Sequence, residues 1–334
     1  MKNSSDHLLD IIVPHYHEPW STIEKFFTIL DLQRGVSFSS FRVILVNDGE
    51  ENALPEEHFS SREYDVWQMS IPHAGVSAAR NHGLKSATAP WVMFCDCDDM
   101  FFHPFALMDI LNVLPNDKAD LLWTDYFTEA NRKFNATVIM KTGFDAVFVH
   151  GKLYRRQFLL DHNIFFDEEI SYCEDSLFNT TAWTIADEKR TGHIATQCPT
   201  YVWCDTDGSV TNTYKTRDIA PVSVFHRNKK VCDLYHRLRP YDQYCAMIAR
   251  TIIDAYYVLN LSVLTDTLKE LKKDVRTFYI EHKAQYEAVP YETLKLIKEK
   301  SKKCVFPNDM PIIENVSVTQ WLKRLESESE KEEL

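Results

Sequence analysis

The stretch Trp91–Met100 reads Trp-Val-Met-Phe-Cys-Asp-Cys-Asp-Asp-Met and joins an apolar run to a group of carboxylates. A short apolar run bounded by polar residues predicts a buried strand. In α/β proteins, ligands bind at the carboxyl ends of such strands. The sequence therefore places Asp96, Asp98 and Asp99 at the mouth of a predicted sheet.

These three aspartates predict a metal site. Alternation along a strand puts Asp96 and Asp98 on the same side, where their charges repel one another. A hard divalent cation with oxygen ligands relieves that repulsion and keeps positions open for phosphate oxygens. The alternative is a solvated acidic turn after a strand, because Asp-x-Asp alone is a weak signal.

Composition limits the class of protein. With 334 residues and 45% apolar content, the chain can bury a substantial core in one or two domains. A net charge of −12 argues against binding nucleic acid through the overall field, although a local basic groove is not excluded. The eight cysteines contain no Cys-x-x-Cys pair and fit neither a zinc site nor a small disulfide scaffold.

We therefore expect reduced thiols and a cytoplasmic protein. The first ten residues contain no apolar signal core. No stretch approaches the roughly 18 uninterrupted apolar residues of a membrane span. The oligomeric state cannot be read from the sequence.

Apolar runs and helical spacing alternate along the first two thirds of the chain. Strands are predicted at residues 8–13, 41–46, 66–71, 91–95 and 119–126, and helices at residues 20–32 and 78–84. Such alternation predicts a mostly parallel sheet with crossover helices. The residues from 147 through Leu160 are expected to include a helix, and another helix begins near Glu174 and Asp175.

After about residue 214 the pattern becomes helical. Apolar residues lie on one predicted helical face at Tyr244, Ile248, Ile252, Ala255 and Leu259. We expect a catalytic domain over residues 1–215 and a helical domain over residues 216–334. The helical domain would serve acceptor selection, membrane proximity or oligomerisation.

The motifs of the first two thirds occur in a fixed order. They are Val-Pro-x-Tyr, Val-Asn-Asp-Gly, Gly-Val-Ser-Ala-Ala-Arg-Asn-x-Gly-Leu, Phe-Cys-Asp-Cys-Asp-Asp, Gly-Lys-Leu-Tyr-Arg-Arg and Glu-Asp-Ser-Leu-Phe. This series resembles the family-2 glycosyltransferases, which have a GT-A fold. The resemblance implies an α/β, Rossmann-like, mostly parallel sheet flanked by helices, and it does not extend into the C-terminal helical domain.

The resemblance also implies how a nucleotide-sugar donor is held. By this resemblance, the nucleotide base of the donor would be held by Pro14, Tyr16, Glu18 and Asp48. Asp48 can accept a hydrogen bond from a uracil ring N–H, and Tyr16 can pack on the base. For these two residues the alternatives are a helix cap and a core aromatic. Arg80 matches the arginine beside the base and diphosphate, and its alternative is a surface arginine paired with carboxylates.

Asp96 and Asp98 of this chain match the family's Asp-x-Asp motif, and Asp99 lies beside them. The implied cofactor is Mn²⁺ or Mg²⁺, which would neutralise the leaving diphosphate of a UDP-sugar. Which of the three aspartates contacts the metal directly is left open.

Glu174 and Asp175 match the family's Glu-Asp pair, in which one carboxylate acts as general base. We assign that role to Asp175, which would deprotonate an acceptor hydroxyl in a single inverting displacement. The alternative, which is compatible with this role, is stabilisation of the helix dipole. Lys152 is expected to contact phosphate or sugar, or else to lie on a solvated helix face, and His150 is expected to be structural.

The late loop departs from the family, which often carries a basic residue there. This chain has Asp205 and Asp207 ahead of Ser209, which puts a loop-borne clamp on the diphosphate in doubt. The neighbouring Tyr201 and Trp203 either stack on a sugar or belong to the core.

The sequence thus predicts a metal-dependent inverting glycosyltransferase that uses a UDP-sugar and a glycan-type acceptor, such as a cell-surface polysaccharide or a lipid-linked sugar. Three alternatives stay open. They are a non-catalytic sugar- or nucleotide-binding module on the same scaffold, a transferase acting on a modified base in phage DNA, and a nucleotidyltransferase. A nucleotidyltransferase would usually carry a Gly-rich basic loop after the first strand, where this chain has Pro14 to His17.

Overall fold

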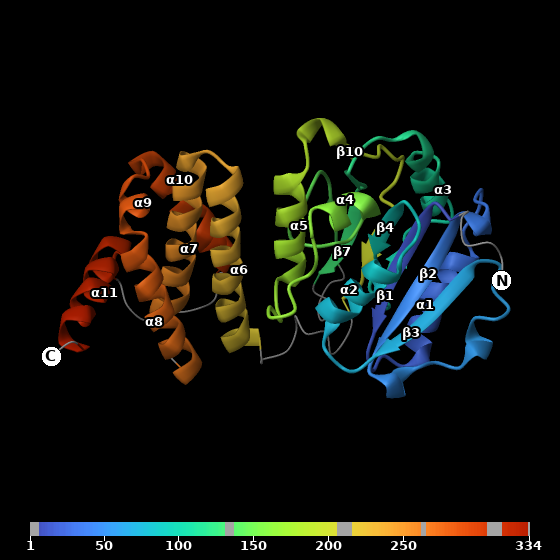
Figure 1. Ribbon diagram of the computed structural model, residues 1–334, viewed down its shortest axis with the longest axis horizontal. Coiled ribbons are helices and arrows are strands. Elements are labelled where there is room, and N and C mark those ends of the chain that lie inside the picture. Colours follow the sequence, from blue (N-terminus) through green and yellow to red (C-terminus); the bar gives the residue numbers. More distant parts are fainter. Residues whose placement is uncertain (1–6, 131–136, 206–215, 262–264, 306–315, 333–334) are drawn as a thin grey trace. The chain divides into compact units, whose positions relative to one another are not determined.

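The computed structural model describes residues 7–130, 137–205, 216–261, 265–305 and 316–332. The chain forms two compact units, Met1–Asn212 and Thr213–Leu334. Figure 1 shows the α/β architecture of the first unit and the helices of the second.

A seven-stranded sheet forms the centre of the first unit, in the order β10-β6-β9-β4-β1-β2-β3. The pairs β4–β1, β1–β2, β2–β3 and β10–β6 are parallel, whereas β9 runs antiparallel to both β4 and β6. The strands are β1 (Leu9–His15), β2 (Phe41–Asp48), β3 (Asp65–Ile71), β4 (Trp91–Phe94), β6 (Leu121–Trp123), β9 (Lys152–Arg155) and β10 (Thr191–His193).

A second, four-stranded sheet has the order β5-β11-β7-β8. Its strands are β5 (Met100–Phe101), β7 (Tyr126–Ala130), β8 (Thr137–Lys141) and β11 (Tyr201–Trp203). β11 is parallel to β7 and antiparallel to β5, while β8 pairs antiparallel with β7 at the edge.

Alternation along the strands builds a core on each face of the large sheet. From β1, Ile11 packs with the apolar residues of α1 (Trp20–Asp31) and α3 (Ala106–Leu111). Its neighbour Ile12 packs on the other face with residues of α2 (Val76–Ser86), α4 (Arg156–Asp161) and α5 (Glu174–Ile185). Both faces of the central strands are therefore buried, as expected for strands flanked by crossover helices.

Small residues bring α2 close to the sheet. A Cβ atom at Gly83 would lie 2.4 Å from Cγ2 of Ile12, so only glycine allows this approach. Gly75 is the N-cap of α2 and has a positive φ of 94°, which favours glycine.

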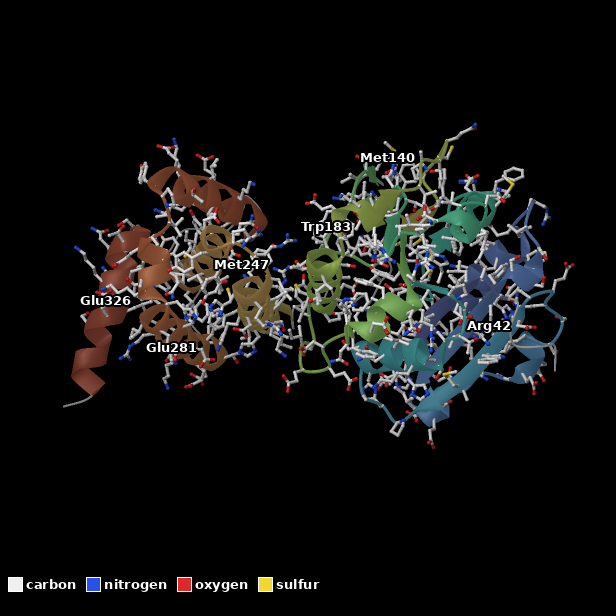
Figure 2. All side chains as sticks on the ribbon, turned by 45° about the horizontal axis from the view of Figure 1, so that its top comes forward. Arg42, Met140, Trp183, Met247, Glu281 and Glu326 are labelled. Carbon is white, nitrogen blue, oxygen red and sulfur yellow. The ribbon has the colours of Figure 1, made fainter. Side chains whose placement is uncertain are left out.

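The second unit is built from helices only in its described residues. They are α6 (Thr216–Leu238), α7 (Tyr241–Leu261), α8 (Asp266–Glu281), α9 (Lys283–Glu287), α10 (Tyr291–Val305) and α11 (Val318–Glu332). The predicted apolar face lies on α7, which packs against α6, α8, α9 and α10, and its five residues are all buried. Met247 of α7 is also buried (Figure 2).

The structure confirms the expected α/β class, with a mostly parallel sheet and a C-terminal helical region. The helix expected between residue 147 and Leu160 is present only from Arg156, where α4 begins, because Lys152–Arg155 form the antiparallel strand β9. Among the described helices, none combines the length and apolar character that crossing a membrane would require.

Candidate active site

Three neighbouring strands end at the edge of the sheet where the carboxylates were expected. β2 ends at Asp48, β1 ends at His15, and β4 ends at Phe94, two residues before Asp96. Since these strands are parallel, their carboxyl ends share one edge.

Asp96 to Asp99 form a turn and do not continue the strand. The turn is closed by a hydrogen bond of 3.2 Å from the Asp99 N–H to the Asp96 carbonyl. The strand alternation from which Asp96 and Asp98 were predicted to lie on one side therefore does not extend to these residues. The turn leaves Asp96 partly exposed and buries Asp99.

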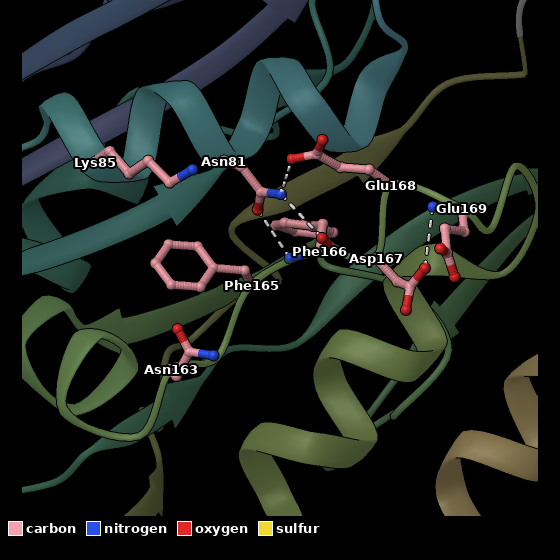
Figure 3. Close-up of a pocket in the computed structure, with 8 residues that line it drawn as sticks. All are labelled: Asn81, Lys85, Asn163, Phe165, Phe166, Asp167, Glu168 and Glu169. Carbon is pink, nitrogen blue, oxygen red and sulfur yellow. Dashed lines mark hydrogen bonds between the residues drawn. The ribbon is translucent and has the colours of Figure 1, made fainter.

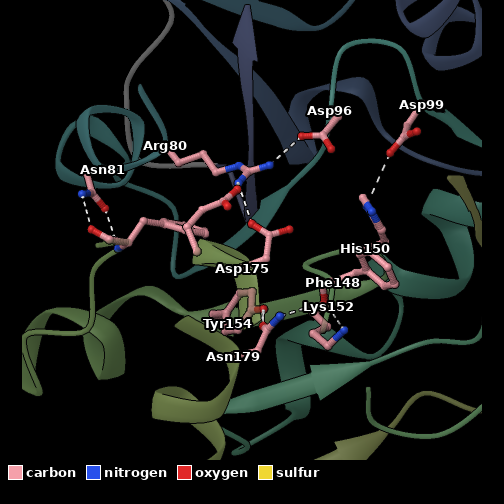
Figure 4. Close-up of polar contacts among 12 residues, drawn as sticks. Arg80, Asn81, Asp96, Asp99, Phe148, His150, Lys152, Tyr154, Asp175 and Asn179 are labelled. Atoms are coloured by element: carbon pink, nitrogen blue, oxygen red, sulfur yellow. Dashed lines mark hydrogen bonds and ion pairs between the residues drawn. The ribbon is translucent and has the colours of Figure 1, made fainter. Parts of the chain in front are cut away.

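Arg80 of α2 lies at the centre of the acidic group (Figure 4). Its Nη2 donates to Asp96 Oδ1 at 2.8 Å, and its Nη1 donates to Glu174 Oε1 at 3.1 Å and to Asp175 Oδ1 at 2.6 Å. Arg80 is only 3% exposed, so these are largely desolvated, charge-assisted bonds. One guanidinium thus connects the acidic turn to the start of α5.

Burial and this guanidinium act against each other on the carboxylates. Burial is the largest effect and opposes ionisation of Asp96, but Arg80 and His150 together outweigh it and the pKa of Asp96 is lowered. For Asp175, burial is the largest effect and raises the pKa to about 8, with Glu174 and Asp96 adding to the rise and Arg80 opposing it. A carboxylate with such a pKa is suited to accept a proton near neutral pH.

Helix α5 presents the Glu174–Asp175 pair in its first turn. Its N-cap, Cys173, has a left-handed backbone with φ 66°. Both carboxylates lie at the positive end of the helix dipole, so helix stabilisation and a catalytic role are compatible.

Asp48 is fixed at the end of β2. Its carboxylate accepts hydrogen bonds from the N–H groups of Ala74 and Gly75, at 2.7 and 2.9 Å, and lies 2.9 Å from Nδ1 of His73. These contacts tie the end of β2 to the beginning of α2. His73 was not among the residues predicted from the sequence, although it opens the same motif that contains Gly75 and Arg80.

The other residues predicted to hold the base lie at the end of β1. Tyr16 is 37% exposed and stacks on His73, with ring centroids 4.2 Å apart. Its N–H donates to Glu18 Oε2 at 2.8 Å, whereas Pro14 is a buried residue within β1. The aromatic core alternative for Tyr16 does not hold, because its ring lies at the surface.

Lys152 lies inside the first unit. It is 1% exposed, its ammonium group donates to the Phe148 carbonyl, and it lies near the rings of Tyr126 and Phe144. Burial lowers its pKa to about 8. The solvated helix face considered for Lys152 is therefore wrong, and its ammonium group is held by the protein itself.

Asp96, Asp99 and His150 bring potential metal-binding atoms together. One carboxylate oxygen from each aspartate and one ring nitrogen of His150 all lie within 4.8 Å of one another. Asp99 Oδ1 accepts from the N–H of Cys204 at 2.8 Å, and Oδ2 accepts from the Tyr201 hydroxyl at 3.0 Å. Burial raises the pKa of Asp99 and lowers that of His150 to about 4, so the imidazole is neutral at pH 7.

This donor set fits a divalent cation, because two carboxylates supply oxygen ligands and a neutral imidazole supplies nitrogen. Asp98 is not part of the group, and it has interactions of its own.

The late loop is described only in part, and Asp207 and Ser209 lie outside the described residues. The N–H of Asp205 donates to Glu129 Oε2 at 3.1 Å. Tyr201 is fully buried and belongs to the core, whereas Trp203 is half-buried.

A separate open pocket of about 430 Å³ lies where α2 meets residues 163–169 (Figure 3). The side chain of Asn81 fixes this junction, donating to the Phe166 carbonyl and Glu168 Oε1 and accepting from the Phe166 N–H at 2.8–2.9 Å. The lining of this pocket contains neither Arg80 nor the acidic turn, so the pocket is separate from the candidate site.

The first unit matches a known protein family. Residues 10–170 match the family model described as "Glycosyl transferase family 2". The "Uncharacterized glycosyltransferase EpsJ" of Bacillus subtilis is 30% identical over 205 residues, which cover 55% of this chain and 58% of that protein.

A second relative is "Poly(ribitol-phosphate) beta-N-acetylglucosaminyltransferase TarS" of Staphylococcus aureus. It is 25% identical over 188 residues, which cover 52% of this chain and 32% of that protein. The chain thus matches less than two thirds of the length of either relative.

Two solved structures share the fold. The structure of S. aureus TarS residues 1–349 in complex with UDP-GlcNAc has a TM-score of 0.50 at 16% identity, covering 92% of this chain and 99% of that chain. The mannosyltransferase PcManGT of Pyrobaculum calidifontis, in complex with GDP-Man and Mn²⁺, has a TM-score of 0.52 at 12% identity, covering 97% and 85%. These similarities confirm the predicted GT-A fold.

Proposed function

We propose, on the premise that residues 10–170 match glycosyl transferase family 2, that this chain transfers a sugar from a UDP-sugar to an acceptor hydroxyl, with inversion and with a divalent cation. The observation that carries the proposal is the bridge made by Arg80. The guanidinium of Arg80 donates hydrogen bonds both to Asp96, which is expected to face the diphosphate, and to Asp175, the expected general base.

The donor would bind along the ends of β1, β2 and β4. Tyr16 offers an exposed ring for the base, Asp48 offers a carboxylate fixed by backbone N–H groups, and Pro14 and Glu18 shape the end of β1. TarS was solved with UDP-GlcNAc, which makes this donor the first to test. GDP-mannose, the donor in the PcManGT structure, is the natural comparison.

The acidic turn would hold Mn²⁺ or Mg²⁺ through Asp96, with Asp98 and Asp99 beside it. When bound, such a cation neutralises the charge that develops on a leaving diphosphate. The residues of the chain do the rest. Arg80 holds the acidic turn and the start of α5 together, so the base keeps its place when the donor enters.

Asp175 would accept the proton of the acceptor hydroxyl. Burial keeps its pKa near 8, and the neighbouring Glu174 contributes to that value. As the acceptor oxygen attacks the anomeric carbon, its proton passes to Asp175 and the bond to the diphosphate breaks on the opposite face. A single displacement of this kind inverts the anomeric configuration.

The acceptor would be a glycan-type hydroxyl, and the TarS name makes a ribitol-phosphate polymer a suitable first candidate. The helical unit would contribute acceptor selection or oligomerisation.

The test combines binding and turnover. Thermal shift against UDP, GDP and ATP, with and without Mn²⁺, should give stabilisation by UDP that depends on the metal, and stabilisation by ATP alone would point to a nucleotidyltransferase instead. Hydrolysis of a UDP-sugar panel then identifies the donor. Asp96→Ala should remove the Mn²⁺ dependence of UDP binding, and unchanged dependence would exclude Asp96 from the metal site.

Asp175→Asn should keep UDP-sugar binding and lose turnover by about 10²–10⁴-fold, the usual contribution of general base catalysis. Asp161→Asn, on the surface helix α4, is the matched control and should keep both. Turnover retained in Asp175→Asn would refute the assignment of the base.

A further inference from the structure

His150 is held in one orientation by aromatic rings. It is 2% exposed, and its ring lies nearly parallel to those of Tyr201 and Phe148, with centroids 5.6 and 5.5 Å away and interplanar angles of 14° and 23°. The ring of Trp203 lies 6.4 Å away. A histidine enclosed in this way cannot turn toward solvent to satisfy its nitrogens.

Within the described residues, Nδ1 of His150 is buried and has no hydrogen-bond partner. The nearest acidic atom is Asp99 Oδ2, at 3.4 Å (Figure 4). A buried polar atom without a partner is costly, so its orientation requires an explanation. A neutral imidazole nitrogen that faces carboxylates is also a good metal ligand.

The two carboxylates that face His150 are oriented by hydrogen bonds and keep lone pairs for a metal ion. Asp99 is oriented by Tyr201 and Cys204, which together use only two of its four lone pairs. Asp96 accepts a hydrogen bond from Arg80 through Oδ1 and retains lone pairs for another partner. Hydrogen bonds of this kind orient the ligands of a metal ion.

We propose that His150 is a direct ligand of the divalent cation, completing with Asp96 and Asp99 a set of two carboxylates and one imidazole. The proposal rests on the proposed function for the role of the cation, but the ligand set follows from the structure alone. It assigns a metal-binding role to a residue outside the acidic motif.

The ligand set has a consequence for metal selection. Mg²⁺ is bound through oxygen ligands, whereas an imidazole favours transition-metal ions. The site should therefore prefer Mn²⁺ over Mg²⁺, and this preference should depend on His150.

The test is pulsed electron paramagnetic resonance of Mn²⁺ bound to the full chain without any donor. We expect modulation from a coordinated ¹⁴N nucleus, replaced by ¹⁵N modulation when the protein is labelled with [¹⁵N]histidine. His150→Gln should lose this modulation and bind Mn²⁺ at least about tenfold more weakly, the lower end of what disturbing a metal site costs. It should also lose the preference for Mn²⁺ over Mg²⁺.

His193→Gln is the matched control, because His193 also lies beside an aspartate, 2.9 Å from Asp125, but outside this group. It should keep the nitrogen modulation and the affinity. The labelled, unsubstituted protein provides a test even if His150→Gln does not fold. Bound Mn²⁺ without nitrogen coupling, or coupling that survives in folded His150→Gln, would overturn the proposal.

The two proposals fail in different ways. Mn²⁺ bound without nitrogen coupling, alongside normal UDP-sugar hydrolysis, would remove His150 from the site and leave the transferase intact. Histidine coupling in a protein that neither binds nor hydrolyses nucleotide sugars would keep the metal site and remove the transferase.

Discussion

Replacing Arg80 with methionine tests whether this residue holds the acidic site together. The substitution keeps an unbranched apolar chain and removes the guanidinium, leaving Asp96, Glu174 and Asp175 without the bonds of 2.6–3.1 Å that they now accept. Removing one partner of a buried ion pair typically costs about 3–5 kcal/mol. The three carboxylates are 14–28% exposed, so we expect the lower end of this range.

The assay is urea unfolding at pH 8 followed by tryptophan fluorescence. Six of the seven tryptophans lie in Met1–Asn212, so the signal reports mainly on the unit that contains Arg80. Arg190→Met is the matched control, because Arg190 pairs with Asp120 at 2.6 Å but is about half exposed. An exposed ion pair of that kind contributes about 0–1 kcal/mol.

Two further measurements make the test specific. The decrease in the free energy of unfolding caused by Arg80→Met should be smaller at pH 5, because carboxylates that no longer face a guanidinium take up protons more readily. The loss should also be smaller in an Asp175→Asn background, since the two side chains interact directly. A loss no larger than that of Arg190→Met, or one unaffected by Asp175→Asn, would refute a central role for Arg80.

Two predictions concern pH. Because the pKa of Asp175 is raised to about 8, mainly by burial, kcat/KM for transfer should rise with pH through neutrality and level off above about pH 8. Glu174→Gln should move that rise to lower pH, and a flat profile would contradict the assignment. For His150, the pKa is lowered from 6.5 to about 4 by burial, so the unfolded chain binds more protons in this interval and stability falls as pH falls. For a shift of this size, the expected decrease in the free energy of unfolding between pH 6.5 and 4 is about 3 kcal/mol. Urea unfolding with a chelator present should show a smaller decrease in the free energy of unfolding in His150→Gln. An equal dependence of that free energy on pH in both proteins would exclude His150 as the cause.

The position of Arg80 changes how the acidic site is understood. The sequence suggests that a cation and a diphosphate are needed to make so many carboxylates tolerable at one edge. In the structure, the chain supplies part of the compensation itself, through a guanidinium from α2. The candidate site is thus held together before any ligand enters, which favours a fixed geometry for Asp175.

The sequence by itself determined the order of the elements and the edge at which the site lies. Apolar runs are local, and those at Ile11, Val43 and Met93 become parallel neighbours because alternating strands and helices permit few other arrangements. Each run ends in polar residues, and parallel strands collect their ends at one edge. This made it predictable that Asp48 and Asp96 follow strands that end at the same edge of the sheet.

Only the tertiary structure decided which charged groups meet. Arg80 and Asp175 lie 95 positions apart, and no local pattern indicates that one guanidinium serves both Asp175 and Asp96. The turn after Phe94 breaks the alternation on which the prediction for Asp98 depended. Lys152 was expected at a ligand or on a solvated face, but the antiparallel strand β9 carries it into the interior.

His150 illustrates the same limit. A single histidine in a sequence carries no information on what surrounds it, because burial and partners depend on long-range packing. Here the rings of Phe148, Tyr201 and Trp203 exclude water, while the turn brings two carboxylates to its nitrogen. Local sequence determines where the strands end. Packing between distant segments determines the protonation state and the bonding partners of each side chain found there.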